Sequence, residues 1–248
     1  MSKTLEVSNN LIAEDLYVAD APSAFQHEAP APLLVPVAAL QPVRETSATY
    51  AWLKRCLDIC GACVGVLVLG PIMLVAMMAV WIEDGGPVLF RQQRVGLNGK
   101  RFTMIKIRSM VRNAEERLEE VKALNVHDDD RTFKAVNDPR VLRSGAFLRR
   151  FSIDEFPQVF NVLKGEMSLV GPRPSLVHEV EMYAPEDHVR FEVKPGLTCF
   201  WQIAGRGEIA FDGQLALDKR YIDQQSMLTD LSIIARTVPA MIRGDGAR

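Results

Sequence analysis

"CLDICGACVGVLVLGPIMLVAMMAVWI", residues 56–82, is the stretch that constrains how the rest of the chain can be arranged. Asp58 is its only charged residue, and the 24 residues from Ile59 to Ile82 are apolar without interruption. A helix that spans a bilayer needs roughly 20 apolar residues. We therefore predict that this part of the chain is helical and lies in a membrane.

Gly70 and Pro71 fall at the middle of this run and disturb the predicted helix. A proline inside a helix removes a backbone hydrogen bond and clashes with the preceding turn, so a kink is expected. One alternative is a kinked helix that spans the bilayer. The other is a re-entrant hairpin, which breaks at Gly70-Pro71 and leaves through the face that it entered. A broken helix in lipid must find partners for its freed backbone groups, which by itself favours the span.

Basic residues flank the apolar run on both sides, so the flanking charges do not set its orientation. They are Lys54 and Arg55 before the run and Arg91, Arg94, Lys100 and Arg101 after it.

Residues 1–46 differ in composition from the rest of the chain, because they are rich in Ala, Pro and acidic residues and show no sustained period. We interpret them as a flexible tail, and they lack the basic start and apolar core of a signal peptide. Residues 1–50 hold two basic and six acidic side chains, which leaves 27 basic and 25 acidic side chains for the remainder. The remainder is only mildly basic and carries no recognised nucleic-acid motif, so we expect no nucleic-acid partner.

The segment "PVLFRQQRVGLNGKRFTMIKIRSM", residues 87–110, predicts two short strands joined at Asn98-Gly99, a strong hairpin signal. Residues 91–112 contain seven basic and no acidic side chains. Such a run is often a solvated face. Beside a membrane segment, however, it more commonly meets anionic headgroups or phosphates.

The segment "RRFSIDEFPQVFNVLKGE", residues 149–166, places Asp154 and Glu155 side by side at the start of a predicted amphipathic helix that Gly165 ends. The simplest role for these carboxylates is helix capping. Pro157 fits that role poorly, because it either costs a helix hydrogen bond or removes one of the amides that a cap would bind.

A functional role uses the same position differently. A helix N-terminus suits phosphate, and Arg149 and Arg150 add guanidinium donors. Adjacent carboxylates on a helix diverge by about 100 degrees, so we expect Asp154 and Glu155 to differ in role. One can face a reacting phosphorus atom while the other binds Mg²⁺, and a carboxylate nucleophile is known in aspartyl-phosphate enzymes. The residues alone do not say which carboxylate does which.

Five motifs in order resemble the bacterial polyprenyl-phosphate hexose-1-phosphate transferases, also called monotopic phosphoglycosyl transferases. The likeness runs from about residue 50 to the C-terminus. The motifs are KRCLDI (54–59), the membrane run with its central proline, GGPVLFRQQRVGLNGKRFTMIKIRSM (85–110), DPRVLRSGAFLRRFSIDEFPQVFNVLKGEMSLVGPRPS (138–175) and VKPGLTCFWQIAGR (193–206).

The resemblance implies an enzyme that moves a sugar 1-phosphate from a UDP-sugar to polyprenyl (undecaprenyl) phosphate and releases UMP. It assigns Asp154 as the nucleophile, which forms a covalent phosphosugar intermediate, and Glu155 as the Mg²⁺ residue. Lys106, Arg149 and Arg173 map onto contacts to phosphate or lipid headgroup. Galactose or glucose is the expected sugar, and the product would begin an exopolysaccharide or another glycoconjugate.

The resemblance also implies a membrane-associated fold of the α/β (α+β) class. A re-entrant helix over residues 50–83, broken at Gly70 and Pro71, would precede a catalytic domain over residues 84–248. That domain would carry a short β-hairpin and amphipathic interfacial helices on the cytoplasmic face of the bacterial inner membrane. A helical stripe near the C-terminus is then either core or interfacial; it comprises Leu231, Ile234, Val238, Met241 and Ile242.

Two other classes of function compete with the transferase. A non-catalytic membrane adaptor of the same fold would not need the whole set of Asp154, Glu155, Arg149 and Arg173. A hydrolase acting on soluble substrates would not need a segment in lipid. The sequence leaves open which sugar is transferred and whether the protein is a homodimer.

Overall fold

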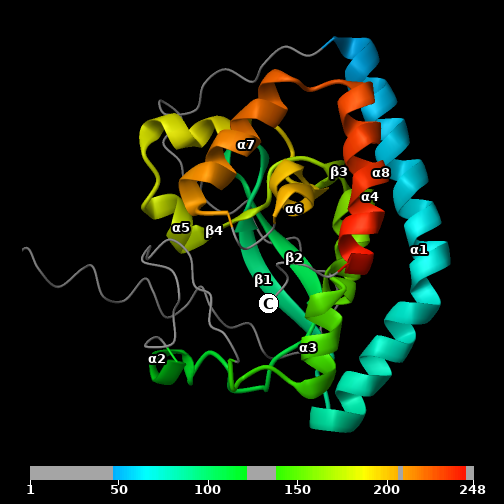
Figure 1. The fold of residues 1–248 in the computed structure, drawn as a ribbon, viewed down its shortest axis with the longest axis vertical. Helices are drawn as coiled ribbons and strands as arrows, with labels where there is room; N and C mark the ends of the chain where they lie inside the picture. Colours follow the sequence, from blue (N-terminus) through cyan, green and yellow to red (C-terminus); the bar gives the residue numbers. More distant parts are fainter. Residues whose placement is uncertain (1–46, 122–137, 206–208, 244–248) are drawn as a thin grey trace, which may run out of the picture.

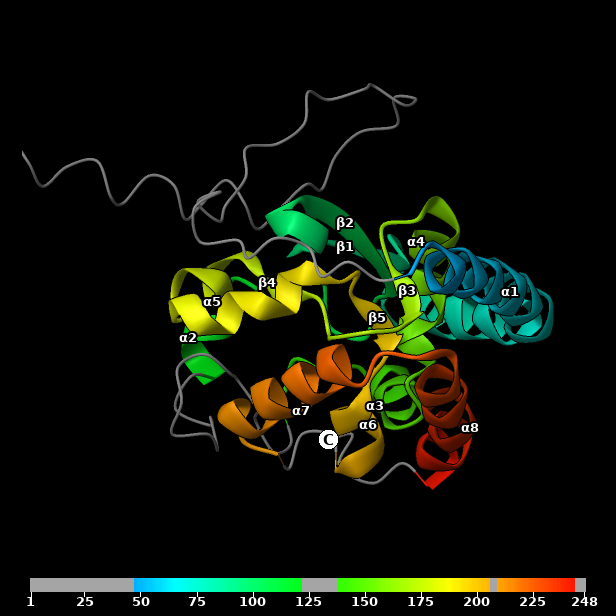
Figure 2. The same ribbon diagram turned by 90° about the horizontal axis from the view of Figure 1, so that it is seen from above.

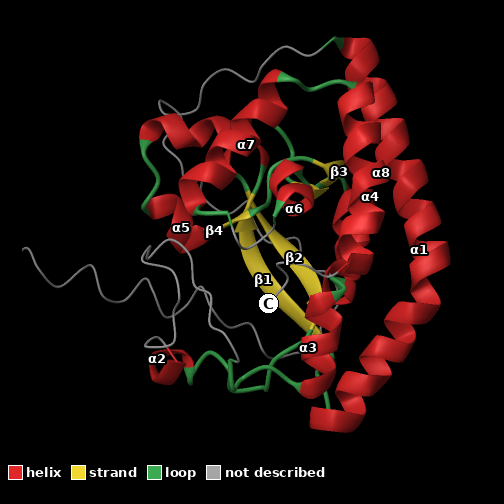
Figure 3. Ribbon diagram, viewed as in Figure 1, coloured by secondary structure: helices red, strands yellow, loops and turns green. Residues whose placement is uncertain are grey.

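The computed structural model describes residues 47–121, 138–205 and 209–243 and arranges them against one long helix, α1 (Ala48–Asp84). The predicted tail, residues 1–46, lies outside the described residues. Figure 1 shows α1 along one side of the molecule, and Figure 3 shows the mixture of helices and strands that the sequence predicts.

The strands form two small sheets, one of order β2-β1-β4 and one of order β3-β5. They are β1 (Leu89–Val95), β2 (Arg101–Ile107), β3 (Ser168–Val170), β4 (Ser175–Leu176) and β5 (Gly196–Thr198). The other helices are η2 (Leu97–Gly99), α2 (Leu118–Val121), α3 (Arg143–Arg150), η4 (Ile153–Gln158), α4 (Val159–Lys164), α5 (Val177–Glu181), η5 (Pro185–Glu192), α6 (Phe200–Ala204), α7 (Phe211–Asp223) and α8 (Met227–Arg243).

Within the described residues, α1 is the one helix long and apolar enough to cross a membrane. Many of its large apolar side chains are not covered by protein; Leu67 is 79% exposed and Ile82 is 72% exposed. Large apolar patches open to the outside mark a surface that meets lipid or another protein. The exposure therefore agrees with the predicted membrane association.

The predicted break at Gly70-Pro71 is not seen, because α1 continues through both residues with Pro71 inside it. Figure 1 shows α1 curving around the globular part of the molecule. A proline withdraws one hydrogen bond from a helix, and bending can accommodate its ring without ending the helix. The structure thus bears out a disturbed helix but not two separate arms of a hairpin.

A buried polar cluster attaches the first half of α1 to the globular part. We call it the anchor cluster; its side chains are Tyr50, Lys54, Asp58, Tyr221 and Asp230. The Lys54 Nζ atom lies 3.1 Å from Asp230 Oδ2 and 3.7 Å from Asp58 Oδ1, and it donates to the Val170 carbonyl at 3.1 Å. The hydroxyls of Tyr50 and Tyr221 donate to the two Asp230 oxygens at 3.0 and 2.8 Å.

Asp58 extends the anchor cluster to β3, because its Oδ1 atom accepts from Ser168 Oγ and from the Leu169 amide, both at 2.9 Å. Arg55, next to Lys54, donates to the carbonyls of Val162 and Leu163 at 2.8 Å. The basic residues before the apolar run are therefore occupied by contacts within the protein.

The predicted hairpin is confirmed: β1 and β2 pair in antiparallel register from Leu89↔Ile107 to Val95↔Arg101. Asn98 and Gly99 have φ values of 57° and 69°, which is the left-handed region that favours Asn and Gly in tight hairpin turns. Alternate residues of a strand share a face, so Lys106 lies on the same face of β2 as the buried Phe102 and Met104. That face packs against α4 and the middle of α1.

The predicted single helix after Ser152 is in fact a 3₁₀ helix, η4, followed by α4. Ser152 makes no side-chain cap and has φ 56°, and Pro157 lies inside η4. A change from 3₁₀ to α geometry at this point accommodates the proline, which explains why one continuous α-helix does not form. Gly165 ends α4 with φ 85°, as predicted.

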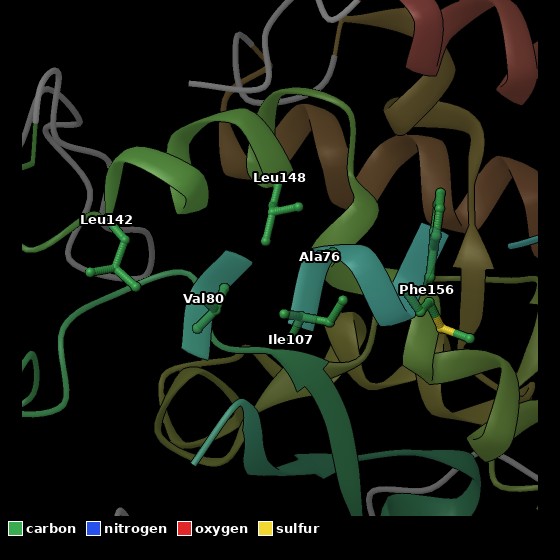
Figure 4. Packing of buried hydrophobic residues seen from close by; sticks show 7 residues of the cluster. Ala76, Val80, Ile107, Leu142, Leu148 and Phe156 are labelled. Atoms are coloured by element: carbon green, nitrogen blue, oxygen red, sulfur yellow. The ribbon is translucent and has the colours of Figure 1, made fainter. Parts of the chain in front are cut away.

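An apolar cluster holds η4 between α1, α3 and the end of β2. Figure 4 shows Ala76 and Val80 of α1 facing Ile107, Leu148 and Phe156. Nearby, the fully buried Asn161 donates from Nδ2 to the Thr103 carbonyl at 2.7 Å, and its Oδ1 accepts from the Ile105 amide at 3.3 Å. Asn161 thus joins α4 to the backbone of β2.

Helix α8 lies alongside α1 in both views (Figures 1 and 2). Part of its predicted stripe is open to the outside, since Val238 is 57% exposed and Ile242 is 70% exposed. Ile233 faces inward and is fully buried. Ile234 and Met241 of the stripe pack against buried clusters, so the stripe is partly core and partly open to the outside.

Candidate active site

A sharp turn between α3 and η4 brings the basic end of one helix next to the acidic start of the other. The chain leaves α3 through Ser152, a non-glycine residue in the left-handed region, whose amide donates to the Arg149 carbonyl at 3.1 Å. A left-handed serine costs on the order of 1 kcal/mol, and such strain persists where the surrounding structure enforces it. The turn brings Arg149 close enough for its charge to act on Asp154.

The two adjacent carboxylates have different surroundings. Glu155 Oε1 accepts from Lys106 Nζ at 2.9 Å and lies 3.6 Å from Arg173 Nη1. Asp154 is only 8% exposed, and among the described residues it forms no ion pair. One carboxylate is therefore held by cations, while the other is buried and available. The surroundings of the two carboxylates thus differ, and the different roles expected for them stay predictions.

Arg173 comes from the loop between β3 and β4, far in sequence from Lys106, and its side chain is 37% exposed. Its guanidinium carbon lies 5.8 Å from the centre of the Trp201 ring, a cation–π distance. Arg173 thus lies between Glu155 and an aromatic face. The structure brings together the predicted residues Lys106, Asp154, Glu155 and Arg173.

The electrostatic surroundings separate the pKa values of the two carboxylates. Burial, reinforced by the charge of Glu155, raises the pKa of Asp154 to about 6, although Lys106 and Arg149 oppose the shift. Burial would also raise the pKa of Glu155, but the charges of Lys106 and Arg173 outweigh it, so the pKa is lowered. At neutral pH both groups carry charge, and Asp154 is the more basic carboxylate.

Several cations gather around the two carboxylates. Arg94 is buried and lies close enough for its charge to act on Arg173 and Glu155. Burial and the charge of Arg173 lower the pKa of Arg94 to about 10, which leaves it protonated at neutral pH. Lys106 and Arg173 contact Glu155, and the charges of Arg94 and Arg149 act on the pair of carboxylates as well; such a gathering of cations suits a ligand carrying phosphate groups.

The family model for bacterial sugar transferases matches residues 49–244. The chain belongs to the bacterial sugar transferase family. That match includes all but the first residue of α1, the hairpin and every site residue described above.

Named relatives of this bacterial sugar transferase include a Salmonella typhimurium protein called undecaprenyl-phosphate galactose phosphotransferase. It is 39% identical over 199 residues, which are 79% of this chain and 42% of the relative. The exopolysaccharide production protein ExoY of Rhizobium meliloti is 39% identical over 197 residues, 78% of this chain and 87% of the relative.

A third relative is the UDP-glucose:undecaprenyl-phosphate glucose-1-phosphate transferase of Caulobacter vibrioides. It is 39% identical over 202 residues, 78% of this chain and 71% of the relative. The chain thus spans less than half of the Salmonella relative and most of the other two.

The donor set of this sugar transferase limits how it could hold Mg²⁺. No group of three His, Cys, Asp or Glu side chains that could bind a metal occurs within residues 47–121, 138–205 and 209–243. Mg²⁺ commonly takes only one or two carboxylates and completes its shell with phosphate oxygens and water. The ionised Glu155, with Asp154 beside it, fits that mode.

Sequence reasoning missed the buried residues that support the site. Arg190 and Asp218 form an ion pair at 2.6 Å behind the Arg173 loop, and Arg94 donates to the Pro174 carbonyl at 3.0 Å. The prolines on either side of Arg173 indicate, in the sequence, that this loop needs support from other elements. They lack an N–H, so the carbonyls of that loop need donors from elsewhere. Which donors supply them depends on tertiary contacts that the sequence pattern does not encode.

Proposed function

We propose that this protein is a phosphoglycosyl transferase that moves a sugar 1-phosphate from a UDP-sugar to undecaprenyl phosphate. The observation that carries the proposal is the buried Asp154, which pairs with no cation among the described residues, next to a Glu155 that Lys106 and Arg173 hold. The names of the relatives support the lipid carrier, and they favour galactose or glucose as the sugar. The product would enter exopolysaccharide synthesis, as the name of the Rhizobium relative suggests.

In the first step, a carboxylate oxygen of Asp154 attacks the phosphorus that carries the sugar. A bond forms between that oxygen and phosphorus, the phosphoanhydride bond breaks, and UMP leaves with the bond's electron pair. The raised pKa of Asp154 makes its carboxylate a better nucleophile than an ordinary aspartate while leaving it largely ionised at neutral pH. The nearby cations can neutralise the charge that develops on the phosphates.

In the second step, a phosphate oxygen of the lipid attacks the same phosphorus and displaces the Asp154 carboxylate. The product is a lipid-linked diphosphate sugar, and the enzyme returns to its starting form. Glu155 would hold Mg²⁺ together with phosphate oxygens, and the ion would supply further neutralising charge.

We also propose that α1 enters and leaves the membrane through its cytoplasmic face, as in the re-entrant arrangement that the family resemblance implies. The curved helix keeps both of its ends attached to the globular part: the anchor cluster holds the first half, and Arg108 binds Asp84 at the other end. A straight span would separate those attachments across the bilayer.

The transfer reaction is tested with the purified full chain, Mg²⁺, undecaprenyl phosphate and a panel of UDP-sugars. We expect UMP release with one or few of the sugars. Without the lipid, release should stop near one UMP per protein, and the protein should gain the mass of a sugar phosphate. No UMP with any sugar would exclude the transferase. Turnover only when both substrates are present, without a labelled protein, would exclude the covalent intermediate.

The membrane arrangement is tested by labelling single cysteines in sealed vesicles, with the four native cysteines replaced. Thr49→Cys and Arg91→Cys place one cysteine in the first turn of α1 and one after the helix, in β1. Reaction of both positions from the same side supports re-entry, whereas reaction from opposite sides would show that α1 spans the bilayer.

A further inference from the structure

The loop that carries Arg173 has too few N–H donors of its own to satisfy its buried carbonyls. Its sequence, residues 171–174, is Gly-Pro-Arg-Pro, and Gly171, Pro172 and Pro174 are all buried. The prolines supply no N–H donors, whereas every residue of the loop has a carbonyl that needs a partner once buried. Donors must therefore reach the loop from other elements.

Two buried arginines donate to successive carbonyls of this loop. Arg190 Nη2 donates to the Arg173 carbonyl at 3.2 Å, and Arg94 Nη1 donates to the Pro174 carbonyl at 3.0 Å. The Gly196 amide donates to the Pro172 carbonyl at 2.8 Å. The loop is thus held from behind, while the Arg173 side chain extends on the other side toward Glu155 and Trp201.

Arg190 distributes its donors over three different elements. Besides the loop carbonyl, it pairs with Asp218 of α7 at 2.6 Å and donates from Nη1 to the Tyr183 hydroxyl at 2.8 Å. Arg190 is 7% exposed and Asp218 is 1% exposed. Burying an ion pair is costly, and apolar side chains of similar size are often at least as stabilising. Stability alone therefore explains this pair poorly.

We propose that Arg190, fixed by Asp218, is a positioning residue for Arg173. It acts through the Arg173 carbonyl, and so determines where the Arg173 guanidinium lies relative to Glu155 and the phosphates of the donor. The proposal rests on the proposed function, in which Arg173 contacts phosphate. It predicts that Arg190 matters for the reaction only while Arg173 is present.

The first test is a double-mutant cycle on donor kinetics. Arg173→Met should lower kcat/KM for the UDP-sugar about 100-fold, and Arg190→Lys about 10-fold, mainly through KM. The double variant should be no worse than Arg173→Met alone. Equal effects of Arg190→Lys with and without Arg173 would overturn the proposal.

Arg108→Lys is the matched control, because Arg108 is another buried arginine that donates to backbone carbonyls beside a proline, those of Gly85 and Pro87. It does not contact the Arg173 loop, so its effect should be the same with and without Arg173. If the cycle for Arg108 were as non-additive as that for Arg190, the coupling would be general and the proposal would fail.

The second test needs no turnover, so it also decides the proposal if the transferase activity proves wrong. Trp52 and Trp81 are exposed, and their replacement by Phe leaves Trp201 as the single tryptophan. Arg173→Met should change the Trp201 emission, because the cation over the ring is lost. Arg190→Lys should produce the same change with Arg173 intact. An emission unchanged from the parent would overturn the proposal.

Two milder variants cover the case in which Arg190→Lys does not fold. Asp218→Asn keeps the shape of the side chain but removes its charge, and Tyr183→Phe removes one hydroxyl partner of Arg190. Both should shift the Trp201 emission in the direction of Arg173→Met, with the smaller shift for Tyr183→Phe. Folded variants with unshifted emission would contradict the positioning role.

Discussion

Two clusters of charged residues in this molecule are built from similar side chains and differ in how completely they are paired. In the anchor cluster, Lys54 contacts Asp58 and Asp230, and hydroxyl or amide groups donate to both carboxylates. In the candidate site, Glu155 is paired with Lys106 and Arg173, whereas Asp154 pairs with no cation among the described residues. A cluster that completes its own pairing stabilises the fold, whereas one left incomplete is prepared for a ligand.

Asp154→Asn should cause the largest loss of activity and, in contrast, a gain in stability. The amide cannot act as the nucleophile, so turnover should fall at least about 1000-fold. Because burial raises the pKa of Asp154 to about 6, the folded chain pays to ionise it at neutral pH. The free energy of unfolding of the variant should therefore be higher by on the order of 1–3 kcal/mol. UMP release and denaturant unfolding measure the two effects; retained turnover or a less stable protein would contradict this contrast.

Asp230→Asn should show the reverse pattern. It leaves Lys54 buried without its nearest carboxylate, and breaking a buried pair costs about 3–5 kcal/mol. The free energy of unfolding should fall by that amount, while turnover per folded molecule changes little. Glu186→Gln, at an exposed carboxylate, is the control and should change neither quantity. If Asp230→Asn were stable but inactive, the anchor cluster would have a catalytic role instead.

Pyrophosphate should stabilise the protein through the candidate site but not through the anchor cluster. A ligand at 100 times its Kd stabilises the folded state by about 2.7 kcal/mol. The increase in Tm should be lost in Arg173→Met and kept in Asp230→Asn. An equal increase in all three proteins would show that the anion binds elsewhere.

The smallest expected effect is on the pH dependence of turnover and of stability. It follows from the same difference between the two clusters. Turnover needs the ionised Asp154, so it should fall about tenfold per unit as the pH drops below about 6. Stability should change in the other direction: between about pH 4 and 6 the folded chain binds a proton at Asp154 that the unfolded chain has lost. Raising the pH through that window therefore costs stability in the parent and not in Asp154→Asn, which unfolding curves at several pH values would show.

The hairpin and the apolar helix could be predicted from the sequence because each depends on local patterns, and the pairing of two adjacent carboxylates is a local pattern too, although their reaction stays a proposal. Asp154 and Glu155 lie next to each other, and Asn98-Gly99 encodes a turn within four residues. The sequence pattern presents Lys54 and Arg55 as charges that flank the apolar run, yet in the structure both make contacts with elements more than 100 residues away. The support of Arg173 by Arg190 and Asp218 also joins separate elements, so no periodicity or spacing could reveal it.

The path of α1 is a second feature that the sequence pattern does not determine. A central Gly-Pro pair indicates a disturbance of the helix, but the pattern cannot distinguish a bend from a break. The outcome depends on whether packing holds the two halves together. Here residues on both sides of Pro71 contact the same globular part, from Ala62 to Val80.

The Asn161 side chain covers backbone groups at the outer edge of the hairpin. Strand β2 is at the edge of its sheet, and an uncovered edge offers N–H and C=O groups to a strand of any passing chain. The Asn161 side chain occupies two of those groups, much as a neighbouring strand would. The helix that follows the two adjacent carboxylates thereby covers part of this edge, so Asn161→Ala would be expected to promote aggregation as well as to loosen the contact between α4 and β2.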